Sequence, residues 1–158
     1  MLRICFVCLG NICRSPIAEG VMSHLVQAAG LQNEILVDSA GTAGYHEGEP
    51  PDARAVAAAA RRGIALHGRA RQLRQGDYDS FDYLLAMDRS NLEHLLSKAP
   101  RSARSKIRLL RSYEAGADTD APVRDPYYGS ASDFDEVVDV CMAACSGLLA
   151  SLRESYRL

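Results

Sequence analysis

The sequence predicts an α/β fold: a doubly wound sheet of parallel strands with helices on both faces. Short apolar segments are nearly continuous rather than alternating, which is typical of parallel strands covered on both faces. Segments with helical periodicity lie between and after them, and strand–helix alternation of this kind favours a doubly wound sheet. In such sheets ligands bind beyond the carboxyl ends of the strands, where the strand order reverses. The loop after the first strand is therefore the first place to look for a site.

The predicted strands are the apolar segments at residues 2–7, 35–38, 81–87 and 107–110. A first helix is expected over residues 15–29, with Pro16 in its first turn, where a missing N–H is tolerated. A second is expected from Asp52, a good N-cap, to Gly63 at its C-terminal end. A third should follow Asp88, and a long last helix should begin near Ser132, with apolar residues at 3.6-residue spacing.

The connection over residues 116–131 lacks apolar periodicity and is rich in Asp, Pro, Gly and Tyr. Structureless connections of that length inside compact domains are usually functional or disordered. Pro122, Pro126 and the pair Tyr127-Tyr128 favour an ordered, functional loop. We see no internal repeat or linker, so residues 1–158 are expected to form one domain.

The composition of the chain excludes several functional classes. It has 158 residues, 47% of them hydrophobic, and a formal net charge of −2. A pI of about 6.1 disfavours a nucleic-acid partner, and no apolar run approaches the roughly 18 residues of a membrane span. The first apolar segment ends at Gly10-Asn11, too early for a signal peptide. We therefore expect a cytoplasmic protein, with neither nucleic acid nor membrane as partner, whose five cysteines are thiols.

The segment after the first predicted strand has the composition of a phosphate-binding loop that carries a nucleophile. It reads Cys8-Leu9-Gly10-Asn11-Ile12-Cys13-Arg14-Ser15. Such a loop must curl so that successive backbone N–H groups point at an anion, and Gly10 and Asn11 tolerate the conformations that this requires. The following helix adds the partial positive charge of its N-terminus.

Two side chains complete this loop chemically. Arg14 can hold two phosphate oxygens bidentately, which lysine does not reproduce. The same positive groups should stabilise Cys8 as a thiolate, the reactive form of cysteine. Ser15, beside the helix start, could donate a hydrogen bond to the sulfur as it leaves a phosphocysteine. The strand before the loop and the helix after it make the pattern specific.

Four motifs, in order, resemble the low-molecular-weight protein tyrosine phosphatase family. They are Cys8-Leu9-Gly10-Asn11-Ile12-Cys13-Arg14-Ser15-Pro16, Asp38-Ser39-Ala40-Gly41-Thr42, Ala86-Met87-Asp88 and Asp125-Pro126-Tyr127-Tyr128. The resemblance covers essentially the whole chain. It implies a four-stranded parallel sheet, a phosphocysteine intermediate on Cys8, no metal or cofactor, and a tyrosine-phosphorylated protein as substrate, a bacterial tyrosine kinase among the candidates. We expect a monomer, and leave open weak self-association through its tyrosines.

The leaving phenol needs a proton, and we assign Asp125 as the general acid and then the general base toward water. Pro126 restricts the Asp125 backbone to extended conformations, which fixes the direction of the carboxylate. The resemblance places Tyr127 and Tyr128 at one wall of the entrance and Tyr45 at the other. Leu9 and Ile12 would line the floor of a flat slot that suits a phenyl ring.

The resemblance also implies supporting residues. Asn11 and Ser39 match a hydrogen-bonded pair that braces the phosphate loop, whereas a histidine common in relatives is replaced by Gly68, with His67 one position earlier. We assign His67 no role. Cys13 is five residues from Cys8, and the family suggests a reversible disulfide between them that protects Cys8 from over-oxidation.

Two alternatives were weighed against a phosphatase. A thiol-coupled arsenate reductase on the same scaffold would need further cysteines near the site, commonly after the third strand, and residues 64–106 contain none. A phosphate-binding or redox-sensing module without turnover would be expected to lose the nucleophile, the arginine or the acid. Cys8, Arg14 and Asp125 are all present.

Overall fold

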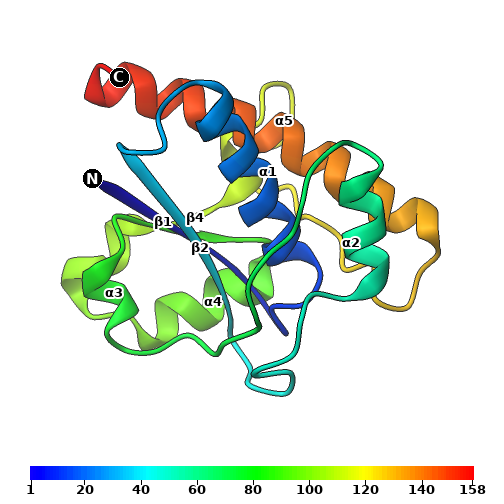
Figure 1. Cartoon of the computed structure of the whole chain (residues 1–158). Helices are drawn as coiled ribbons and strands as arrows, with labels where there is room; N and C mark the ends of the chain where they lie inside the picture. The colour runs from blue at the N-terminus through cyan, green and yellow to red at the C-terminus, as the bar shows by residue number, and fades with distance from the viewer.

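The computed structural model describes residues 1–158, and its centre is a four-stranded parallel sheet in the order β2-β1-β3-β4 (Figure 1). The strands are β1 (Leu2–Cys8), β2 (Ile35–Gly41), β3 (Tyr83–Ala86) and β4 (Ile107–Leu109). The chain moves from β1 to β2 on one side and then crosses to β3 on the other, so the strand order reverses at β1. The predicted α/β class and parallel sheet are confirmed.

Helices cover both faces of the sheet (Figure 1). On one side α1 (Arg14–Ala28), α2 (Ala53–Ala60) and α5 (Ala131–Tyr156) share one hydrophobic core with alternate residues of β1, including Ile4 and Phe6. On the other side α3 (Asp77–Ser80) and α4 (Arg89–Lys98) share a second hydrophobic core with Cys5 and Val7. Both sets of β1 side chains are therefore buried, which explains the uninterrupted apolar run of this strand.

The bounds of the elements differ from the predicted ones where tertiary contacts decide. Strand β2 continues past residue 38 to Gly41, because β1 offers partners as far as Cys8. Strand β3 is shorter than predicted, since Phe81 ends α3. The four-residue α3 and the 3₁₀ helices η1 (Arg101–Lys106) and η2 (Leu110–Tyr113) were not predicted, because they are too short to show a period.

The long connection between η2 and α5 is tied to the carboxyl end of the sheet. The backbone N–H of Val123 donates to the carbonyl of Met87, just beyond β3, at 2.7 Å. The Arg111 side chain donates to the carbonyl of Pro122 at 2.9 Å. These contacts bring the Asp125-Pro126 segment beside the end of β1. None of the helices combines the length and the apolarity that a membrane-spanning segment requires.

Candidate active site

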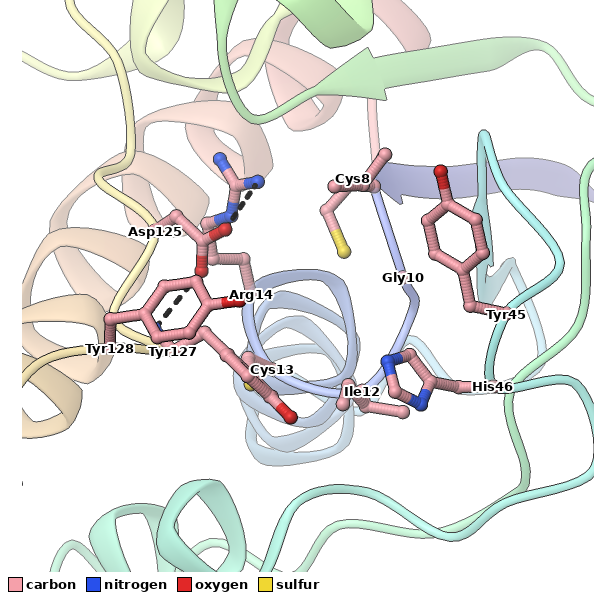
Figure 2. A pocket seen from close by; sticks show the side chains of 11 residues that line it. Cys8, Gly10, Ile12, Cys13, Arg14, Tyr45, His46, Asp125, Tyr127 and Tyr128 are labelled. Atoms are coloured by element: carbon pink, nitrogen blue, oxygen red, sulfur yellow. Dashed lines mark hydrogen bonds and ion pairs between the residues drawn. The ribbon is translucent and has the colours of Figure 1, made fainter.

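A cavity of about 290 Å³ opens at the carboxyl end of β1, at the point where the strand order reverses (Figure 2). Its lining comes from the loop after β1, the loop after β2 and the long connection before α5. The lining residues are Cys8, Leu9, Gly10, Ile12, Cys13, Arg14, Tyr45, His46, Asp125, Tyr127 and Tyr128. Segments that are far apart in the sequence therefore converge on one pocket.

The loop that follows β1 curls tightly around the Cys8 sulfur. Asn11 adopts a left-handed conformation with φ of 57°, which asparagine tolerates better than most residues. Its backbone N–H donates to Cys8 Sγ at 3.3 Å. The loop is held close to β2, because a Cβ on Gly41 would lie only 2.8 Å from the Leu9 carbonyl oxygen. Glycine at this position therefore permits the close approach of the two backbones.

The side chain of Asn11 organises the polar groups behind the loop. Its Oδ1 accepts a bond from the backbone N–H of Arg71 at 3.0 Å, which identifies the other amide atom as the donor. That nitrogen donates to Ser15 Oγ at 2.8 Å and to Ser39 Oγ at 3.0 Å. Both hydroxyls accept from Asn11, so each is free to donate its own proton elsewhere.

The two serine protons reach different acceptors. Ser15 Oγ lies 3.0 Å from Cys8 Sγ, so its hydroxyl is placed to donate to the sulfur when that sulfur is a thiolate. Ser39 donates to Oε1 of Glu19 at 2.5 Å. Ser39 thus supports the loop through Asn11, as expected for the residue that braces it. Asn11, Ser15 and Ser39 lie behind the loop rather than in the cavity lining.

The guanidinium of Arg14 is fixed at one side of the cavity. Its Nη1 donates to Asp88 Oδ2 at 2.6 Å and to the Val123 carbonyl at 3.0 Å. Burial alone would lower the pKa of Arg14, but the Cys8 sulfur and the Asp88 carboxylate outweigh burial and raise that pKa. Arg14 therefore stays charged, and its remaining N–H groups are available to an anion above Cys8.

Asp125 lies beside Arg14 at the rim of the same cavity (Figure 2). Its Oδ2 is 3.8 Å from Arg14 Nη2, and its Oδ1 accepts the backbone N–H of Tyr127 at 3.1 Å. The side chain is 48% exposed, so its carboxyl group is open to solvent and to a ligand in the pocket. The nucleophile, the cation and the carboxyl group assigned from the sequence are thus brought together.

Aromatic side chains stand on opposite sides of the entrance. Figure 2 shows Tyr45 on one side and Tyr127 and Tyr128 on the other. Tyr127 and Tyr128 meet edge to face with ring centroids 5.0 Å apart. Tyr45 is 76% exposed and Tyr128 97% exposed, so both rings are available to a flat ligand. Leu9 and Ile12 add apolar surface to the lining, as predicted.

Sequence reasoning missed the place of one residue that lines this cavity, His46, and the role of one that holds Arg14, Asp88. His46, to which the sequence analysis gave no role, lines the pocket beside Tyr45 and pairs with Glu49. The sequence did carry one indication of this position: His46 follows a predicted strand, and ligands of such sheets bind beyond the carboxyl ends of the strands. Asp88 was quoted at a helix start and in the motif Ala86-Met87-Asp88 but was given no role beside Arg14, whereas it both caps α4 and pairs with Arg14.

The departure from the family pattern at Gly68 has a structural counterpart. His67 is exposed and bonds neither Asn11 nor Ser39. The backbone N–H of Arg71 bonds Asn11 instead. The brace of the phosphate loop therefore contains no histidine in this chain. No group of three or more His, Cys, Asp or Glu side chains is arranged to hold a metal ion.

Comparison with known proteins agrees with this geometry. The family model described as low molecular weight phosphotyrosine protein phosphatase matches residues 3–158. A low molecular weight protein-tyrosine-phosphatase of Streptomyces coelicolor is 48% identical over 157 residues, covering 96% of this chain and 94% of the relative. The Homo sapiens low molecular weight phosphotyrosine protein phosphatase is 44% identical over 148 residues, 92% of each chain. A solved protein tyrosine phosphatase from Entamoeba histolytica superposes with a TM-score of 0.95 at 38% identity, covering 99% of each chain.

Proposed function

The chain belongs to the low molecular weight phosphotyrosine protein phosphatase family, and we propose that it hydrolyses phosphotyrosine through a phosphocysteine intermediate. The observation that carries the mechanism is one cavity lined by the Cys8 sulfur, the Arg14 guanidinium and the Asp125 carboxyl group. These are a nucleophile, an oxyanion clamp and a proton donor, the three groups that transfer of a phosphoryl group from a phenol to a thiolate requires.

In the first step the Cys8 thiolate attacks phosphorus in line with the leaving phenol. The sulfur–phosphorus bond forms as the phosphorus–oxygen bond to the phenol breaks. Asp125, in its protonated form, gives its proton to the departing oxygen. Arg14 and the inward-facing N–H groups of the loop hold the three remaining phosphate oxygens and stabilise the charge that they share.

In the second step water replaces the phenol. The Asp125 carboxylate takes a proton from the attacking water, the phosphorus–oxygen bond forms, and the sulfur–phosphorus bond breaks. The electron pair returns to Cys8, and the Ser15 hydroxyl, 3.0 Å from the sulfur, donates to it as it becomes a thiolate. Inorganic phosphate leaves, and the enzyme is restored.

The aromatic entrance supports a phenolic substrate. A phenyl ring would fit between Tyr45 and the pair Tyr127 and Tyr128, with the phosphate over Cys8. We assign the substrate to tyrosine-phosphorylated proteins, with a bacterial tyrosine kinase as a candidate partner, and the site of action to the cytoplasm. The whole chain acts as one domain and works as a monomer in this proposal.

We also assign the phosphatase a redox-sensitive state. Peroxide would oxidise Cys8 to a sulfenic acid, releasing water. Attack by the Cys13 sulfur would then expel a second water and leave a disulfide that a thiol reductant opens. All five cysteines are free in the structure, and Cys13 lines the same cavity as Cys8.

The test is release of a chromogenic phenol from an aryl phosphate at mildly acidic pH. Cys8→Ser should abolish turnover and vanadate should inhibit it. Asp125→Asn should slow turnover strongly, by about 10² or more, while phosphate still binds. Full activity in Cys8→Ser would show that the nucleophile is assigned wrongly.

A further inference from the structure

Arg54, in the first turn of α2, contacts three elements that meet at the active site. Its Nε and Nη2 donate to the two oxygens of Asp52 at 3.1 and 2.9 Å, and its Nη1 donates to the carbonyl of Tyr127 at 2.9 Å. The guanidinium carbon lies 5.3 Å from the ring centroid of Tyr127 and 4.6 Å from that of Phe134 in α5. One side chain thus joins α2, α5 and the segment that carries the general acid.

At one end, this arrangement is anchored to the phosphate loop. The backbone N–H of Asp52 donates to the carbonyl of Ile12 at 2.8 Å. The Asp52 side chain caps α2 by accepting the Arg54 N–H at 2.8 Å. The hydrogen bond from the Arg54 side chain is the main cause of a lowered pKa for Asp52, so this carboxylate remains ionised and holds the guanidinium.

At the other end, the arrangement reaches the general acid. The N–H of Tyr127 donates to Asp125 Oδ1 at 3.1 Å, so the position of the Tyr127 backbone sets the direction of the carboxyl group. The other oxygen, Oδ2, lies 3.8 Å from Arg14 and faces the cavity (Figure 2). The chain of contacts runs from Ile12 through Asp52, Arg54 and Tyr127 to Asp125.

We propose that Arg54 is a positioning residue for the general acid, and that it fixes the distance between the Asp125 carboxyl group and the phosphate loop. The inference rests on the proposed phosphatase mechanism and deepens it. A planar guanidinium suits this role, because its face lies against aromatic rings while its edge donates hydrogen bonds. A lysine ammonium keeps the charge but has neither the fork nor the flat face.

The test exploits the fact that only a poor leaving group needs its proton. We would measure kcat/KM, which reports the step that forms the phosphocysteine, for aryl phosphates whose phenols range from strongly to weakly acidic. In Arg54→Met we expect about a tenfold or larger loss for phenyl phosphate and less than about a threefold loss for the most acidic phenol. The kcat/KM of Arg54→Lys for phenyl phosphate should lie between the values of Arg54→Met and the wild type.

Asp125→Asn is the reference, because it removes the proton donor itself. Its kcat/KM should depend on the acidity of the phenol in the same way, with a larger loss. Arg61→Met is the matched control, because Arg61 also joins the α2 end to α5, through Asp135 at 2.7 Å, and does not contact the acid segment. It should leave kcat/KM unchanged for every substrate. Vanadate inhibition should be unchanged in both Arg54 variants, since the phosphate loop keeps its own bonds.

If kcat/KM of Arg54→Met fell equally for all aryl phosphates, or did not fall at all, the positioning role would be overturned. If Arg54→Met fails to fold, Arg54→Lys decides: a leaving-group dependence identical to that of the wild type overturns the inference. Failure of the proposed function has a different signature, which is full activity in Cys8→Ser.

Discussion

The Ser15 hydroxyl lies 3.0 Å from the Cys8 sulfur and accepts a hydrogen bond from Asn11, which leaves its own proton available to that sulfur. The Asn11 amide is in turn oriented by the backbone N–H of Arg71. A donor fixed in this way stabilises negative charge on sulfur without reorganising. In the proposed mechanism, charge on the sulfur falls as the phosphocysteine forms and returns as it breaks down, so we expect Ser15 to contribute most to the second step.

Ser15→Ala should therefore slow breakdown of the phosphocysteine more than its formation. A hydrogen bond to a charged group is worth about 1.5–3 kcal/mol, so we expect kcat to fall by about 10–100-fold and kcat/KM by much less. Rapid-mixing measurements should show a burst of phenol followed by slow turnover. Ser112→Ala, in η2, is the control. Equal losses in kcat and kcat/KM would place the hydroxyl in the first step instead.

Asp88→Ala should remove one of the two hydrogen bonds that anchor the Arg14 guanidinium and leave the bond to the Val123 carbonyl. We expect kcat/KM to fall by about tenfold and vanadate inhibition to weaken, because the clamp is no longer preorganised. Loss of the α4 cap should also destabilise the protein by about 1 kcal/mol. Asp88→Asn keeps a capping oxygen and should preserve most of that stability. Unchanged vanadate affinity in Asp88→Ala would contradict this role.

The phosphate loop was predictable because its chemistry is contiguous. Cys8, Gly10, Asn11 and Arg14 lie in one segment between a recognisable strand and a recognisable helix, so local pattern and backbone preference suffice. The placement of Asp125 beside them was predictable only through the resemblance to a family. The hydrogen bond from Val123 to Met87, which holds the long connection against the sheet, is a long-range contact that local sequence patterns do not indicate.

The residues that sequence reasoning missed act over long separations. Asp88 is 74 positions from Arg14, and neither its place at a helix start nor its motif indicated that the two would pair. Arg54 is 73 positions from Tyr127, and nothing in the alanine-rich pattern of α2 marks it as a bridge. Glu19 lies on α1, where a carboxylate is ordinarily a solvated surface group, yet it packs behind the phosphate loop. These pairings follow from tertiary packing.

Cys13→Ser should prevent recovery of activity after peroxide treatment. Burial raises the pKa of Cys13 to about 12, with a smaller contribution from Asp52, so its thiol is protonated and resists direct oxidation. It can still capture a sulfenic acid on Cys8, whereas serine cannot, and Cys8 would then proceed to the irreversible sulfinic acid. The measurement is phosphatase activity after peroxide and then dithiothreitol. Cys141→Ser, which removes another buried thiol with a pKa raised to about 12, should recover like the wild type. Equal recovery in Cys13→Ser would remove the disulfide from the proposal.

Titration of the Glu19 carboxyl group makes the free energy of unfolding depend on pH. Burial, assisted by the nearby Asp38, raises its pKa from 4.5 to about 7, against the opposing effects of the Ser39 hydrogen bond and Arg71. Glu19 lines a small cavity behind the phosphate loop, and the exposed residues His67 and Arg69 line it too. Between pH 4.5 and 7 the folded protein keeps a proton that the unfolded chain has released. Stability therefore falls as pH rises through this range, and by pH 8 the ionised, partly buried carboxylate opposes folding.

Glu19→Gln should remove this dependence, since a glutamine still accepts the Ser39 hydroxyl and carries no charge at any pH. A shift of this size corresponds to at most about 3 kcal/mol. We thus expect the variant to exceed the wild type in free energy of unfolding by about 1–3 kcal/mol at pH 8 and by much less at pH 5. Urea denaturation at the two pH values measures the difference, and Glu93→Gln, at an exposed position of α4, is the control. If the difference in free energy of unfolding between Glu19→Gln and the wild type stayed constant with pH, or narrowed toward pH 8, Glu19 would not be the group that titrates.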